Sequence, residues 1–133
     1  MPKILIVDDD LDILMVVKLV LNHNNFHVYT LSKWQQISQT IVNYDPDLIL
    51  MDVSLGGADG RDICKQLKNA EETKGIPVIL FSAHYDLINN LKDCNPNAVI
   101  TKPFENDKLV EIIHSNLNQK KIEESFHEPT NQI

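Results

Sequence analysis

The chain has 133 residues, of which 43% are hydrophobic and 23% charged, a composition typical of one globular domain. Its formal net charge of -7 argues against a nucleic-acid-binding surface, which needs clustered Lys and Arg, but is compatible with binding a metal cation or a basic peptide. The sequence has neither an apolar run of the roughly 20 residues that a membrane span needs nor a signal-peptide layout, so we expect a cytoplasmic protein that binds neither membrane nor nucleic acid.

The first half of the chain is predicted to alternate strands and helices. Residues 4–7 (ILIV) and 48–51 (LILM) do not alternate with polar residues, which is typical of parallel strands covered on both faces. A weaker run at 26–31 fits an edge strand, and residues 32–35 resemble a capping box that opens the second helix. The first helix is indicated by a stripe at i, i+3 and i+4 spacing: Ile13, Val16, Val17, Val20 and Leu21.

The second half continues the alternation. A third helix is predicted to begin after Gly60 and to end near Gly75, before an apolar strand at 78–81 (VILF). A weaker run at 98–101 (AVIT) fits a near-edge strand. A short polar fourth helix and a fifth helix are marked by their apolar residues, which are Leu87, Ile88 and Leu91 for the fourth and Leu109, Ile112, Ile113 and Leu117 for the fifth.

The order βαβαβαβαβα predicts an α/β domain with a doubly wound parallel sheet, right-handed crossovers and helices on both faces. The sequence turns polar near Gln119, so we assign residues 1–119 to the domain and 120–133 to a polar C-terminal tail, although the fifth helix could continue through Phe126. The two cysteines form no C-x-x-C pair and are expected to be buried free thiols.

Polar residues follow four of the predicted strands. They are Asp8, Asp9, Asp10, Asp52, Ser82 and Lys102. Functional groups in open α/β sheets gather outside the carboxyl ends of the strands, so we expect these side chains to lie together. Taken singly, Asp10 could be a helix cap, Ser82 a turn residue and Lys102 half of a structural ion pair. The conjunction of all four strand ends favours a functional site.

This cluster of carboxylates predicts a metal-assisted phosphoryl acceptor. Two or three carboxylates in one crevice cannot all stay ionised cheaply, so either a pKa rises or a cation binds, and oxygen ligands suit Mg²⁺ (or Mn²⁺). Beside such a metal, the Asp52 carboxylate could attack a phosphoryl group and become an aspartyl phosphate. Lys102 and the metal would stabilise the charge on the transferring oxygens, and the Ser82 hydroxyl would donate a hydrogen bond.

Four motifs together resemble a known family. ILIVDDD, LILMDVSLGGADG, VILFSA and ITKPF, spread over about residues 2–118, are similar to the receiver domain of bacterial two-component response regulators, with a stand-alone receiver of the chemotaxis type as the leading interpretation. The resemblance implies a flavodoxin-like, five-stranded sheet of order 2-1-3-4-5. It also implies a phosphoprotein in two-component signal transduction, phosphorylated by a sensor histidine kinase or a histidine phosphotransfer protein. Such a protein is not an enzyme with a separate substrate, and its phosphorylation switches binding to an output protein.

The resemblance further implies the metal ligands. Asp8 and Asp9 match the acidic pair that handles Mg²⁺, with Asp9 the direct ligand. Asp52 matches the phosphoacceptor, which also contacts the metal. Ser54 stands where the family uses a backbone carbonyl as a metal ligand.

The remaining site residues are assigned by the same resemblance. Ser82 matches the switch hydroxyl, and Lys102 the family's lysine, which is followed by Pro103 in an expected cis peptide. The side chains of His84 and Ser54 are expected at the rim of the site, on the path of an attacking water.

The sequence departs from the family pattern at two positions that bear on function. Gly56 and Gly57 occupy the place of a common proline, and we expect a mobile loop with phosphorylation intact. Val99 stands where a rotating Tyr or Phe is common, and a β-branched side chain cannot sweep inward as a ring can. Val99 and the short fourth helix motivate a second hypothesis, a phosphorylation-independent interaction module on a receiver scaffold, although such a module would have little reason to keep all five site residues. A flavin-binding protein is set aside because DDDLD after the first strand would repel a phosphate, and a nucleotide hydrolase because the sequence has no G-x-x-x-x-G-K-[ST] motif.

Overall fold

The structure, a computed structural model, describes residues 1–84, 86 and 89–127. These residues form a five-stranded parallel sheet of order β2-β1-β3-β4-β5. The elements are β1 (Lys3–Val7), α1 (Leu11–His23), β2 (His27–Leu31), the short 3₁₀ helix η1 (Trp34–Gln36), α2 (Ile37–Tyr44), β3 (Leu48–Asp52), α3 (Gly60–Asn69), β4 (Val78–Ser82), β5 (Ala98–Thr101) and α5 (Asn106–His127). The predicted fold class and strand order are therefore confirmed.

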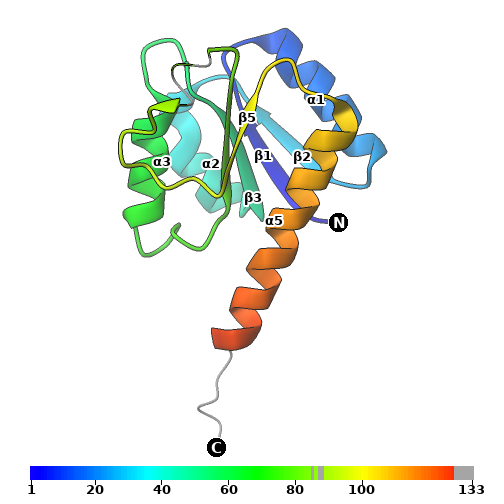
Figure 1. Cartoon of the computed structure of the whole chain (residues 1–133), viewed down its shortest axis with the longest axis vertical. Helices are drawn as coiled ribbons and strands as arrows, with labels where there is room; N and C mark the ends of the chain where they lie inside the picture. Colours follow the sequence, from blue (N-terminus) through cyan, green and yellow to red (C-terminus); the bar gives the residue numbers. More distant parts are fainter. Residues whose placement is uncertain (85, 87–88, 128–133) are drawn as a thin grey trace, which may run out of the picture.

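Each central strand is buried on both faces, as its unbroken apolar sequence predicts. Alternate residues of β1 point to opposite sides, so that Ile4 and Ile6 pack under α1 and α5 while Leu5 and Val7 pack under α2 and α3. Figure 1 shows α1 and α5 on one side of the sheet and α2 and α3 on the other. The two helical layers thus enclose two separate apolar cores.

The register of the sheet brings the carboxyl ends of β1, β3, β4 and β5 to one edge. Val7 pairs with Met51, Asp52 with Phe81, and Ser82 with Thr101. The residues that end or follow these strands therefore lie side by side at that edge, as the sequence predicted.

The structure corrects the predicted stripe of α1. The residues of α1 that are buried are Leu14, Val17 and Leu21, whereas Val16 is 53% exposed. The spacing 14–17–21 follows one helical face more closely than the predicted spacing, because successive residues turn by about 100° and place Val16 beside that face. Asp10 caps this helix: its carboxylate accepts hydrogen bonds from the backbone N–H groups of Asp12 and Ile13.

The predicted capping box at residues 32–35 is wrong. The chain instead forms η1 and then continues into α2 at Ile37, and no side chain among the described residues caps either segment. The 3₁₀ turn has Lys33, not Ser32, at its N-cap position, and Trp34 packs against the core. The third helix ends at Asn69, earlier than predicted, because residues 71–75 form turns in which the Thr73 hydroxyl donates to the carbonyl of Leu67.

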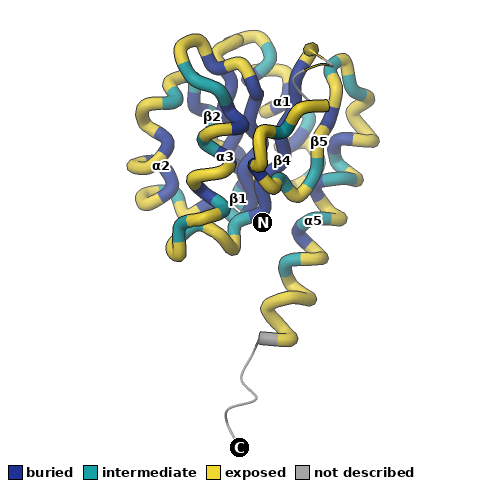
Figure 2. Tube along the Cα trace, turned by 60° about the vertical axis from the view of Figure 1, so that its left-hand side comes forward, coloured by how far each residue is buried: buried dark blue, intermediate teal, exposed yellow. Residues whose placement is uncertain are grey.

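The helix α5 runs farther than the boundary at residue 119. It continues through His127, supported by an ion pair of Lys120 with Glu124 and a hydrogen bond from Gln119 to Glu123, both at i, i+4 spacing. Figure 2 shows this last part of α5 projecting, largely exposed, from the body. Leu87 and Ile88, which mark the predicted fourth helix, lie outside the described residues. None of the helices in the described ranges is long and apolar enough to cross a membrane.

Candidate functional site

Three carboxylates meet at the carboxyl edge of the sheet. Asp8, Asp9 and Asp52 each offer an oxygen, and these oxygens all lie within 4.8 Å of one another. Asp8 is fully buried and Asp52 is 7% exposed, whereas Asp9 is open to solvent. The cluster therefore has two buried carboxylates and one, that of Asp9, which water or a ligand can reach.

Lys102 supplies the positive charge of this cluster. Its Nζ lies 2.9 Å from Asp8 Oδ2 and 3.4 Å from Asp52 Oδ2. The ammonium also lies 4.4 Å from the centre of the Phe81 ring, whose face favours a cation. The Lys102–Pro103 peptide is cis, as expected. Lys102 is thus held between two carboxylates by β5 and the turn that follows it.

The Asp52 carboxyl titrates far from its ordinary range. Burial and then the nearby charge of Asp8 raise its pKa from 3.8 to about 6, although Lys102 and a hydrogen bond from the Ser54 backbone N–H act in the opposite direction. Ionised Asp52 is therefore held at a cost in free energy, which a bound cation would relieve.

The donor set of this cluster fits a magnesium ion. Three carboxylates and one ammonium leave a formal net charge of about -2, which a divalent cation would balance. The donors are hard oxygen atoms, and Mg²⁺ typically binds through one or two carboxylates while keeping several waters. Asp9 is the open member of the cluster, and its role as the direct ligand remains a prediction.

Ser82 lies beside this cluster at the end of β4. It is fully buried, and its Oγ accepts a hydrogen bond from the backbone N–H of His84. The side chain of His84 is exposed, and its place on the path of an attacking water remains a prediction. Ser54 is also exposed; its backbone N–H donates to Asp52, and its backbone pairs with Asp59 in an isolated antiparallel bridge. A metal bond to its carbonyl remains a prediction.

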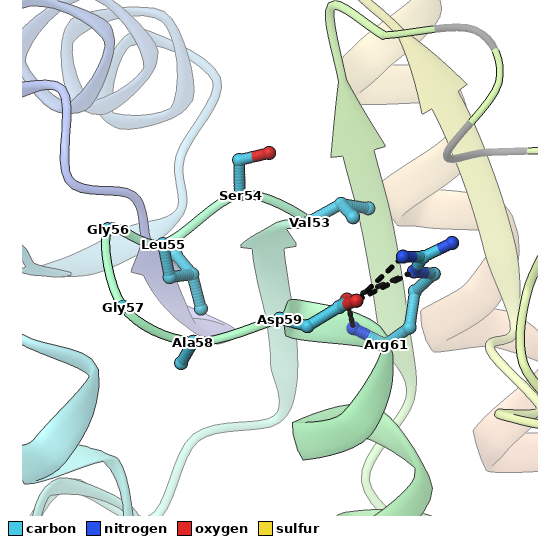
Figure 3. A pocket seen from close by; sticks show the side chains of 8 residues that line it. All are labelled: Val53, Ser54, Leu55, Gly56, Gly57, Ala58, Asp59 and Arg61. Atoms are coloured by element: carbon cyan, nitrogen blue, oxygen red, sulfur yellow. Dashed lines mark hydrogen bonds and ion pairs between the residues drawn. The ribbon is translucent and has the colours of Figure 1, made fainter.

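The two glycines after β3 have a specific conformational role. Both have positive φ, +60° at Gly56 and +107° at Gly57, where other residues are strained. A Cβ at Gly56 would also stand 3.0 Å from Asp9 Oδ2. The loop therefore passes directly over the exposed carboxylate, and its expected mobility remains a prediction. Figure 3 shows how it curves from Val53 round to Asp59.

Sequence reasoning missed a buried ion pair at the end of this loop. Arg61 is only 8% exposed, and its guanidinium forms an ion pair with the Asp59 carboxylate, with 2.6 Å between Nη2 and Oδ2. The sequence Asp-Gly-Arg at a helix start could have signalled it, because Asp59 caps α3 and a charged residue follows in the first turn.

Val99 is 39% exposed, and the ring that packs edge-on against Phe81 is Phe104, with centroids 6.2 Å apart.

Known proteins with similar sequences are longer than this chain. The nisin biosynthesis regulatory protein NisR of Lactococcus lactis is 36% identical over 124 residues, 89% of this chain and 51% of the relative. The phosphate regulon transcriptional regulatory protein PhoB of Pseudomonas aeruginosa is 35% identical over 109 residues, 80% of this chain and 48% of the relative. The chain thus spans about half the length of these relatives.

Solved structures agree with the fold. A putative response regulator from Chloroflexus aurantiacus is 28% identical, with a TM-score of 0.82, and the match covers 89% of this chain and 99% of that one. The chemotaxis response regulator CheY4 of Vibrio cholerae, at 20% identity and a TM-score of 0.78 over 87% and 98% of the two chains, shows the same fold. Residues 4–114 match the family described as the response regulator receiver domain. This chain therefore belongs to the receiver domain family of response regulators.

Proposed function

We propose that Asp52 accepts a phosphoryl group from a phosphorylated histidine of a sensor kinase or phosphotransfer protein, in a reaction that depends on Mg²⁺. The observation that carries this proposal is the position of the Asp52 carboxylate, within reach of two further carboxylates and 3.4 Å from the Lys102 ammonium. Phosphorylation would switch binding to an output protein, in keeping with membership of the receiver family. The chain modifies itself and has no separate substrate to turn over.

The chemistry follows from the chain's own groups. An oxygen of ionised Asp52 attacks the phosphorus, the P–N bond to the donor histidine breaks, and the leaving imidazole takes up a proton. Lys102 is placed to shift from Asp8 toward the incoming phosphoryl oxygens, because it already lies between Asp8 and Asp52. Bound Mg²⁺, held by Asp9 with Asp8 and Asp52, would lower the repulsion between the carboxylate and the phosphoryl group.

Ser82 is suited to the phosphorylated state. Its hydroxyl oxygen accepts from the His84 N–H, and a hydroxyl that accepts one hydrogen bond can still donate its own proton. A phosphoryl oxygen on the neighbouring strand β3 would be an acceptor for that proton.

An exposed apolar face beside the site supports a protein as phosphodonor. Leu11, Met15 and Leu19 recur at i, i+4 and i+8 on α1, and each is more than half exposed. The helix begins two residues after Asp9, so this face flanks the path by which a donor histidine must arrive. Phosphorylation by a small metabolite would not require such an exposed apolar surface.

The test is to incubate the full chain with acetyl phosphate and Mg²⁺ and to measure its intact mass. We expect one phosphoryl adduct, which is lost when EDTA replaces Mg²⁺ and is absent from Asp52→Asn. An adduct that forms equally well on Asp52→Asn would refute the assignment of the acceptor. A parent chain that takes up no phosphate would instead favour a phosphorylation-independent interaction module, the hypothesis that Val99 motivates.

A further inference from the structure

We propose that an ion-pair network of Asp59, Arg61, Asp62 and Lys92, here called the latch, couples phosphorylation of Asp52 to the segment 90–94. The inference rests on the proposed function and adds a regulatory route to it. The segment leads into β5, where Val99 offers no ring to relay a signal. The latch joins this segment to the loop and helix that follow the phosphoacceptor.

Arg61 is the centre of the latch. Its Nε donates to both oxygens of Asp59, at 3.0 and 3.2 Å, and its Nη2 donates to Asp59 Oδ2 at 2.6 Å. Its Nη1 donates to the backbone carbonyl of Asn90 at 2.6 Å. Figure 3 shows the Arg61 guanidinium beside the Asp59 carboxylate at the end of the loop, with the bonds between them dashed. One buried side chain thus bonds both the start of α3 and a segment about thirty residues away in sequence.

Lys92 closes the latch from the other side. Its Nζ lies 3.2 Å from Asp59 Oδ2 and 3.5 Å from Asp62 Oδ1. Hydrogen bonding to Arg61 lowers the pKa of Asp59 to about 2, so the carboxylate is ionised throughout the physiological range. Two acidic and two basic side chains therefore hold the first turn of α3 to residues 90–92.

The latch is mechanically connected to Asp52 through Gly60. A Cβ at Gly60 would overlap the carbonyl oxygen of Asp52, and the Gly60 N–H donates to the carbonyl of Val53 at 2.7 Å. The first turn of α3 therefore rests directly on the backbone of the phosphoacceptor. A displacement of Asp52 on gaining a phosphoryl group would move Gly60, and with it Asp59 and Arg61 on either side.

The other end of the latch is a strained segment. Lys92 and Asp93 have φ of +52° and +61°, a left-handed conformation that costs free energy for residues with a side chain. Such a conformation persists only where the surrounding contacts enforce it. The bonds from Arg61 to Asn90 and from Lys92 to Asp59 are such contacts. Loosening the latch would let the segment relax, which gives it two arrangements to switch between.

Cys94 provides a natural reporter for this switch. It is 2% exposed and packs in the core under α2 and α3, directly after the strained pair. A thiol that is buried in the latched arrangement reacts with N-ethylmaleimide only when the segment opens. The labelling rate at Cys94, followed by peptide mass, therefore measures the opening, and the fully buried Cys64 is distinguished by its own peptide.

The test compares the parent with Arg61→Gln, with and without acetyl phosphate and Mg²⁺, and normalises each rate to the phosphoryl adduct in the same sample. We expect phosphorylation to change the labelling rate of the parent about tenfold, the size of effect that hydrogen bonds to charged groups provide. Arg61→Gln should take up phosphate normally, label quickly from the start and show no further change. Lys92→Gln, which removes a half-exposed partner and leaves the buried Arg61 in place, should lose part of the response and covers the case in which Arg61→Gln fails to fold.

The matched control is Lys74→Gln, which removes the same charge from an exposed ion pair with Glu71 and should behave as the parent. The inference is overturned if Arg61→Gln and Lys92→Gln respond as strongly as the parent. It is equally overturned if the parent forms the adduct with no change in labelling. Absence of any adduct on the parent is a different result, since it refutes the proposed function itself.

Discussion

Two aspartates seven residues apart, Asp52 and Asp59, ionise in opposite surroundings. Burial and the charge of Asp8 raise the pKa of Asp52 to about 6, whereas hydrogen bonds from Arg61 lower the pKa of Asp59 to about 2. The first lies in a cluster with excess negative charge, and the second in the latch, where acids and bases balance. The difference shows that the carboxylates at the edge of the sheet need a bound cation to balance their charge, whereas the charges of the latch balance one another.

The largest expected effect on the free energy of unfolding comes from a substitution at Gly60, where α3 packs on the backbone of Asp52. Gly60→Ala places a Cβ on the carbonyl oxygen of Asp52, where backbone atoms cannot give way. We expect a loss of about 3 kcal/mol or more in the free energy of unfolding, measured by urea titration. Gly75→Ala is the control, because a Cβ there meets no atom within 4 Å. Equal stabilities for the two variants would show that α3 does not rest on Asp52.

The comparison itself is tested by replacing each aspartate with asparagine in the presence of EDTA. Asp52→Asn removes a charge held at a cost, so we expect a gain of about 1–2 kcal/mol at pH 7. Asp59→Asn removes a well-paired charge, so we expect a loss of about 1 kcal/mol. Thermal unfolding from pH 2 to pH 8 measures both.

The pH dependence separates the two variants further. The folded-state pKa of Asp52 is raised, so its stabilising protonated form is lost as the pH rises from about 4 to 6, and the gain of Asp52→Asn appears over that range. The folded-state pKa of Asp59 is lowered, so its contribution is complete above about pH 4 and disappears as the pH falls through 2. Parallel profiles for the two variants would contradict the contrast.

A small effect, no larger than that of Asp59→Asn, is expected at Asp10, which is adjacent to the acidic pair but belongs to neither region. Its carboxylate caps α1 and is not one of the three that meet at the edge. Asp10→Ala should lower the free energy of unfolding by about 1 kcal/mol and leave Mg²⁺-dependent phosphorylation by acetyl phosphate unchanged. A large loss of phosphorylation at unchanged stability would move Asp10 into the site.

The sequence was informative where a run of residues is compatible with few structures. The strands were predictable because unbroken apolar runs have few alternatives to burial in a parallel sheet, and the site because its residues follow those runs directly. The start of α2 was not predictable, because a polar pattern at 32–35 fits a capping box and a 3₁₀ turn equally well. The latch escaped notice because its partners, Arg61 and Lys92, lie far apart in sequence and meet only in the fold.

The glycine loop has one further consequence for how this protein can be observed. The chain has a single tryptophan, and the indole Nε1 of Trp34 is buried under the loop, 3.7 Å from the position of a Cβ at Gly57. This N–H has no hydrogen-bond partner among the described residues. A Cβ at the neighbouring Gly56 would stand 3.0 Å from Asp9 Oδ2, so this pair of glycines lies between the most open carboxylate of the site and the only indole of the chain. We therefore expect tryptophan emission to change when a metal binds at Asp9, which a Mg²⁺ titration of the unlabelled, unmutated protein measures.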